Sequence, residues 1–224
     1  MRRSARFISV AAVLLGFALA FAFTPPRGPR SMRQFDAVRM ADLELRMWKA
    51  YYAKERTQLF ALLVMTLHEQ YHYSWAKATG QAFHLARAAA RFGDWACTED
   101  GGRSDPCRPP SPIQEDLEAA YAAARSWLGA GFDPRAVARA ELAWWVARRT
   151  AGENSVEHVG QLMTQEYALL YETAPERVAS AALLRATAAK LRDEQAAHPD
   201  WDRIGSLLQA SYRELLAALS TENV

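Results

Sequence analysis

Strand-forming and turn-forming residues are scarce in this chain. Of its 224 residues only 13 are valine or isoleucine, and glycine and proline together contribute 21. No alternating apolar–polar pattern persists over a strand-length window, so a sheet-based fold is not indicated. The shortage of glycine and proline excludes a collagen, and a 50% apolar composition excludes a long disordered chain.

The body of the chain also lacks a basic cluster. Residues 1–33 hold six arginines and no acid, which leaves 21 basic and 25 acidic residues in 34–224, a net charge of −4 for that part. Nucleic-acid binding requires a concentrated positive surface. We therefore expect no nucleic-acid partner, in spite of the overall charge of +2.

The chain has only two cysteines, which excludes a disulfide-dense miniprotein. Cys97 and Cys107 bracket the polar stretch 98–106. In an oxidising compartment this arrangement predicts a disulfide, and two unpaired thiols are the alternative. A zinc knuckle would need further cysteine or histidine nearby, and the neighbouring sequence has none.

The only long hydrophobic run stands at the start of the chain. Residues 1–23 begin Met-Arg-Arg and continue with an uncharged stretch over 8–23, a pattern typical of a signal peptide. The stretch 8–23 is roughly 24 Å long as a helix, short of a hydrocarbon core of ~30 Å. A cleaved signal peptide and an uncleaved membrane anchor both remain open. The segment 24–33 is then a basic Pro/Arg linker.

Both alternatives place the folded part outside the cytoplasm. Arginines at the very N-terminus hold that end on the cytoplasmic side of a membrane. We therefore predict an extracytoplasmic protein, either periplasmic or anchored in the inner membrane with its N-terminus in the cytoplasm.

The remaining sequence predicts an all-α fold. Alanine is abundant, with 44 residues, and apolar positions recur at helical spacing. We expect one domain over 34–220 with about eight antiparallel-packed helices and a disordered tail over 221–224. The predicted helices cover about 36–53, 55–73, 75–93, 114–128, 134–149, 156–171, 175–198 and 200–219.

One short motif could carry chemistry. Residues 68–72 read His-Glu-Gln-Tyr-His, which places His68 and His72 one turn apart on the predicted helix over 55–73. Both imidazoles could then ligate one zinc ion, and Glu69 could take a proton from zinc-bound water.

Over these five residues the chain resembles the zincin metallopeptidases, and the resemblance implies a third ligand further along the chain. Glu118 and Glu141 are available for that role. The metzincin extension is absent, because Trp75 and Ala78 stand where glycine and histidine belong. The sheet that zincins place before the motif helix is not predicted either.

Several acids lie on otherwise apolar helix faces, among them Glu44, Glu141 and Glu166. With Glu69 and His72 they supply most of a di-iron carboxylate set, but Leu169 breaks its second Glu-x-x-His pair. The alternative is buried structural ion pairs, since an inward acid must be paired, hydrogen-bonded or protonated. Arg148 is the expected partner of Glu141, and Arg39 and Arg46 flank Glu44.

The sequence therefore favours a non-catalytic domain. Phosphate-binding glycine loops and the serine-hydrolase elbow are both absent. We expect an exported or membrane-tethered helical domain without a cofactor that acts through protein–protein contact. The N-terminal segment would contact the membrane if it is uncleaved. The alternative is a small zinc metallopeptidase that uses Glu69 as base and His68, His72 and Glu141 as zinc ligands.

Overall fold

A computed structural model describes residues 14–95 and 109–220 of the chain. Within them all regular structure is helical, so the all-α prediction is confirmed. A helical segment over residues 14–23 precedes the folded body. The helices of the body are α2 (Ala37–Tyr52), α3 (Arg56–Tyr71), α4 (Trp75–Asp94), α5 (Ser111–Leu128), α6 (Pro134–Ala147), α7 (Val156–Leu170), α8 (Pro175–Glu194) and α9 (Trp201–Ser220).

Side-chain caps fix where several of these helices begin. Asp36 accepts hydrogen bonds from two backbone amides of α2, and Ser74 and Ser155 each cap the helix that follows. Asp133 caps α6, whose first residue is Pro134, a residue that has no amide hydrogen to satisfy. These local signals explain why the starts predicted for α4, α6 and α7 agree with the structure.

The predicted second helix is two residues too long. α3 ends at Tyr71, and His72 takes the left-handed conformation with φ of 54°. This reversal turns the chain toward Ser74, the cap of α4, so that α4 returns along α3. A continuous helix to Tyr73 would have prevented that return.

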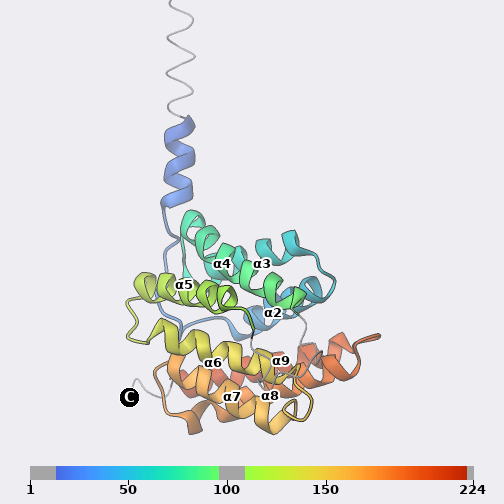
Figure 1. Ribbon diagram of the computed structural model, residues 1–224. Helices are drawn as coiled ribbons and strands as arrows, with labels where there is room; N and C mark the ends of the chain where they lie inside the picture. Colours follow the sequence, from blue (N-terminus) through green and yellow to red (C-terminus); the bar gives the residue numbers. More distant parts are fainter. Residues whose placement is uncertain (1–13, 96–108, 221–224) are drawn as a thin grey trace, which may run out of the picture.

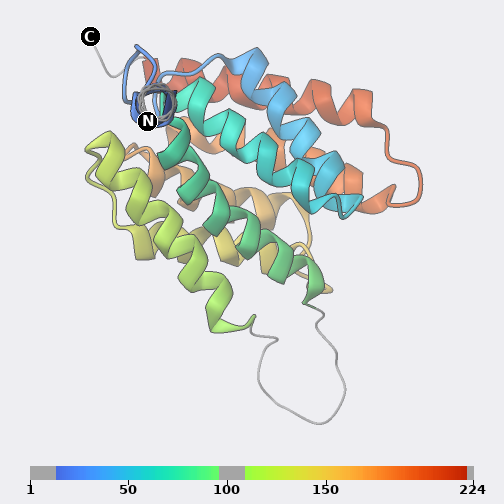
Figure 2. The same cartoon turned by 90° about the horizontal axis from the view of Figure 1, so that it is seen from above.

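The helices form a closed ring. Each of α2 to α9 packs against its neighbours in sequence, and α9 packs back against α2. Figure 1 shows α2 beside α9, with α3 and α4 above them and α7 and α8 below, and Figure 2 shows the same helices from above. In the described residues α6 makes no backbone contact with α2, α4 or α8. The space at the centre of the ring is therefore bridged by side chains.

Small residues let the C-terminal helices approach closely. The buried positions of α8 are nearly all alanine, and Gly160 of α7 lies against Leu183 and Ala186. Alanine is also the best helix former, so the alanines of α8 favour both the stability of the helix and its close packing.

The segment predicted as a linker lies against the bundle. The Pro29 carbonyl oxygen is 3.0 Å from His72 Nδ1, and the Arg30 guanidinium stacks on Trp127, 4.2 Å from the ring centroid. The helical segment over 14–23 projects away from the bundle in Figure 1. Among the described residues, no helix combines the length and apolar character needed to cross a membrane.

Candidate functional site

A cavity of about 410 Å³ lies at the centre of the ring. Its walls come from α2, α3, α4, α6 and α8, and its lining combines aromatic with charged side chains. Pockets of several hundred cubic ångströms with apolar walls and a few convergent polar groups are the usual form of binding sites. The lining residues are Glu44, Met47, Trp48, Tyr51, Tyr52, Leu59, Ala89, Phe92, Glu141, Trp144, Trp145, Arg148, Arg149, Arg185, Arg192 and Asp193.

An ion pair spans the inner end of this cavity. Arg185 Nε on α8 lies 2.9 Å from Glu44 Oε1 on α2, and Trp48 Nε1 donates to the same oxygen at 3.1 Å. The Glu44 side chain is only 4% exposed, and its other oxygen, Oε2, has no hydrogen-bond partner within 3.5 Å. Glu44 is thus a buried carboxylate that Arg185 and Trp48 hold in place.

Two further carboxyl groups lie close together, Glu141 in the lining of the cavity and Glu166 beside it. Tyr121 Oη donates to Glu141 Oε2 at 2.8 Å, and Trp144 Nε1 donates to Glu166 Oε2 at 2.6 Å. Burial, reinforced by the charge of Glu166, raises the pKa of Glu141 to about 8. Burial also raises the pKa of Glu166. Both shifts favour the protonated, uncharged form of these acids.

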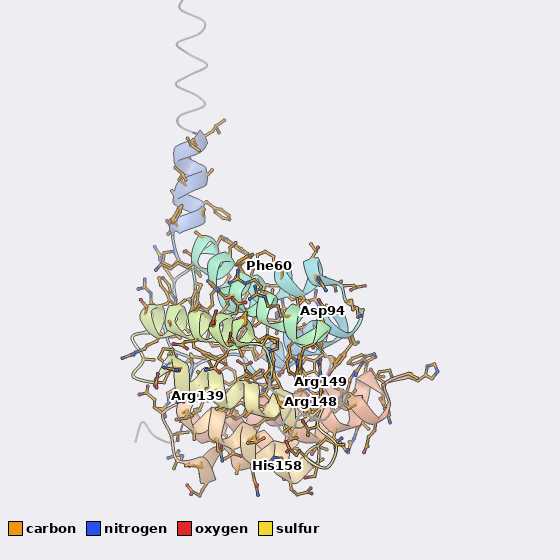
Figure 3. All side chains as sticks on the ribbon, in the orientation of Figure 1. Phe60, Asp94, Arg139, Arg148, Arg149 and His158 are labelled. Carbon is orange, nitrogen blue, oxygen red and sulfur yellow. The ribbon has the colours of Figure 1, made fainter. Side chains whose placement is uncertain are left out.

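Arginines gather at the other end of the cavity. Arg148 Nη2 lies 2.9 Å from Asp193 Oδ2 and donates to Tyr52 Oη at 2.7 Å. The Arg192 guanidinium stacks on the Tyr52 ring, 3.1 Å from its centroid, and lies 3.4 Å from Asp193. Figure 3 shows Arg148 and Arg149 where the upper and lower helices meet.

The His-Glu-x-x-His motif lies elsewhere, at the end of α3, and its side chains have other partners. His68 Nδ1 donates to the Tyr73 carbonyl at 2.7 Å, and its ring stacks on Trp75 at 3.8 Å. Glu69 forms an ion pair with Arg39 at 2.9 Å. His72 lies beyond the helix, so the two histidines do not share a helical turn.

The proposed third ligand, Glu141, lies on α6 and is hydrogen-bonded to Tyr121. In the part of the chain that the structure describes, no group of three or more histidine, cysteine or acidic side chains is arranged to hold a metal ion. Zinc binding by His68, His72 and Glu141 stays a prediction.

The acids on apolar helix faces have polar partners, as expected, but these partners differ from the predicted ones. Glu44 pairs with Arg185 instead of Arg39 or Arg46, and Arg148 pairs with Asp193 instead of Glu141. Two helical turns, about 10 Å, separate Glu141 from Arg148 along α6, so the two side chains reach different ends of the cavity. The predicted disulfide of Cys97 and Cys107 lies outside the described residues.

Sequence reasoning missed Arg185, Arg192 and Asp193, all on α8. In sequence they look like the solvated face of a helix rich in alanine and charge. It also missed Asp116 on α5, which is 3% exposed and receives hydrogen bonds from Arg87 at 2.8 Å and from Arg91. Burial tends to raise the pKa of Asp116, but the hydrogen bonds from Arg87 and His84 outweigh it and lower that pKa. This cluster joins α4 to α5, away from the cavity.

Comparison of the chain with protein-family models, with curated proteins and with solved structures found no match. The geometry of the cavity is thus the observation on which a function can be argued.

Proposed function

We propose that this chain is a non-catalytic binding domain that acts through contact with a protein partner, part of which enters the cavity at the centre of the ring. The observation that carries the proposal is the cavity itself. A ring of helices has no need of an open centre for stability, because an unfilled interior forfeits packing contacts. An aromatic and charged cavity of this volume is instead suited to receiving a ligand group.

The lining favours binding over chemistry. Of the described residues that line the cavity, none is serine, threonine, cysteine, lysine or histidine, so its candidate acids and bases are carboxyl groups and tyrosines. The acids present are engaged: Glu44 with Arg185, Asp193 with Arg148, and Glu141 with Tyr121. Such mutual pairing holds side chains in fixed positions, which supports a recognition site.

We place this domain outside the cytoplasm, released or held at a membrane by the N-terminal segment. The arginine-rich start and apolar stretch over 8–23 support that location. The helical segment over 14–23 projects from the bundle and touches it through Phe21, whose ring lies 6.5 Å from that of Trp75 (Figure 1). This arrangement leaves the cavity unobstructed by that segment.

The proposal is tested by filling the cavity with larger side chains. Ala89→Phe on α4 and Met47→Trp on α2 each add bulk to the lining. The control is Ala61→Phe on α3, an exposed position. Full-length chains carrying each change would be used to recover cross-linked partners from cell-envelope fractions.

We expect the wild type and Ala61→Phe to recover the same partner and both cavity-filling variants to lose it. Circular dichroism would verify that each variant folds. Recovery that is equal in all four proteins, or absent from the wild type, would contradict the proposal.

A further inference from the structure

We infer that the cavity recognises an organic anion, namely a carboxylate carried on a flat apolar body. This inference rests on the proposed function, since it names the chemistry of the group that the same cavity receives. Two features of the lining carry it: an excess of cationic side chains at one end and aromatic walls.

The excess of positive charge is seen by pairing the lining residues. Four arginines line the cavity against three carboxyl groups. Arg185 pairs with Glu44 and Arg148 with Asp193, while the third carboxyl, Glu141, is hydrogen-bonded to a tyrosine. The charge of the lining is therefore positive, and a cavity with low-dielectric walls favours a ligand of opposite sign.

The surplus charge lies on Arg149 and Arg192. Arg149 donates to Tyr51 Oη at 2.7 Å and to backbone carbonyls, and has no carboxylate partner within the described chain. Arg192 reaches Asp193 at 3.4 Å, an acid already paired with Arg148. A guanidinium that shares its carboxylate with a second arginine is suited to a further carboxylate, which accepts parallel N–H bonds from it.

The walls between the two ends are aromatic. Trp48, Trp144 and Trp145 lie with Phe92 and the two tyrosines of α2 around the cavity. The rings of Trp144 and Trp145 meet edge to face with centroids 6.1 Å apart, so their orientation is fixed. Flat apolar groups gain most from such walls, through burial and ring–ring contact.

The charge of Glu44 sets the direction of the ligand. Glu44 pairs with Arg185, which lies two turns of α8, about 10 Å, before Arg192. A carboxylate is repelled by Glu44 and attracted by the arginines, so its flat apolar body lies against the aromatic walls. An indole side chain beside a carboxylate, in a free acid or at the end of a polypeptide chain, has this form.

The test compares two probes that differ only in charge. The full chain would be titrated by calorimetry with N-acetyltryptophan and with N-acetyltryptophanamide at pH 7. We expect the acid to bind at least tenfold more tightly than the amide. Arg192→Gln should remove this preference and Arg192→Lys should retain part of it. Arg213→Gln, at an exposed position on α9, should leave it unchanged.

A pentapeptide with a C-terminal tryptophan distinguishes the two sources of the ligand, which are a free acid and the end of a polypeptide chain. Equal binding of this peptide and the single acid supports a chain end, and binding of the single acid alone supports a free acid. Equal affinity for the acid and the amide, lost together in Ala89→Phe, would overturn the anion inference and leave the cavity as a binding site. Binding of neither probe by the wild type would overturn the inference, whereas the partner-recovery experiment tests the proposed function separately.

Discussion

Arg185 on α8 reaches across the ring to Glu44 on α2, with its Nε 2.9 Å from Glu44 Oε1, although the two helices have no backbone contact in the described chain. This pair and the Arg148–Asp193 pair between α6 and α8 bridge the ring where helix cannot pack on helix. Each needs a long side chain, which is why the centre of this protein is charged and aromatic. The same bridges leave the cavity between them.

Breaking the inner pair should cost substantial stability. Arg185→Met keeps most of the side-chain volume but leaves Glu44 buried without its cation, and such uncompensated charges cost about 3–5 kcal/mol. Urea unfolding would measure the free energy of unfolding of wild type and variant. Arg213→Met, exposed on α9, is the control and should change it by less than about 0.5 kcal/mol. A loss no greater in Arg185→Met than in the control would contradict the buried-pair account.

The double variant sharpens this test. In Glu44→Gln combined with Arg185→Met no buried charge is left unpaired, so part of the lost stability should return. Purely additive losses would show that the two side chains do not interact.

Glu141 should make stability depend on pH. Its folded-state pKa is about 8 against an ordinary value of 4.5, so between these pH values the folded protein holds a proton that the unfolded chain has released. The free energy of unfolding should therefore fall as pH rises through this window. Each unit of pKa difference corresponds to about 1.4 kcal/mol, so the total is a few kcal/mol. The groups that face Glu141 are Tyr121, Glu166, Arg185 and Glu44.

Glu141→Gln isolates this effect. The amide keeps an acceptor for Tyr121 Oη but cannot ionise, so the stability difference between variant and wild type should grow in the variant's favour from pH 5 to pH 8. Denaturant unfolding at several pH values measures it. A difference that is constant with pH would show that Glu141 titrates normally.

Gly28 should be required for docking of the segment 24–33. Its φ is 156°, and a Cβ added there would collide with the His72 ring. Gly28→Ala should displace His72 from Pro29 and detach the stretch around Arg30 from the bundle, so that trypsin can bind it. Gly80→Ala is the control, because nothing lies within 4 Å of a Cβ at that site. Mass spectrometry of timed digests should show faster cleavage after Arg30 in Gly28→Ala only, and equal rates in both variants would contradict the prediction.

The geometry at the end of α3 leads us to expect little zinc. His68 and His72 are held by the Tyr73 and Pro29 carbonyls, and they are not presented on one helical face. Elemental analysis of the untagged chain after incubation with zinc should find well below one ion per chain. Near one zinc, lost in His68→Ala, would favour the peptidase, and loss of hydrolysis in Glu69→Gln would then support Glu69 as its base.

Local signals predicted the helices well, and the site poorly. The Asp133–Pro134 start of α6 and the serine caps depend only on residues adjacent in the chain, so they can be recognised in the sequence. The ring closure of α9 on α2 is not, because it joins helices at opposite ends of the domain. Glu44, Glu141 and Glu166 were recognisable as acids on apolar faces. Arg185 was not, because an arginine among alanines is typical of a solvated face, and only the open centre of the ring turns it inward.

Photo-cross-linking from inside the cavity tests the central claim most directly. A benzophenone amino acid would replace Tyr51, a half-buried residue of the lining, and in a second chain Arg213, exposed on α9. After irradiation in the cell envelope, we predict a covalent partner adduct from position 51 that disappears when Ala89→Phe is added, and none from position 213. An adduct from position 213 alone, or one from position 51 that survives filling of the cavity, would contradict the claim that the partner enters it.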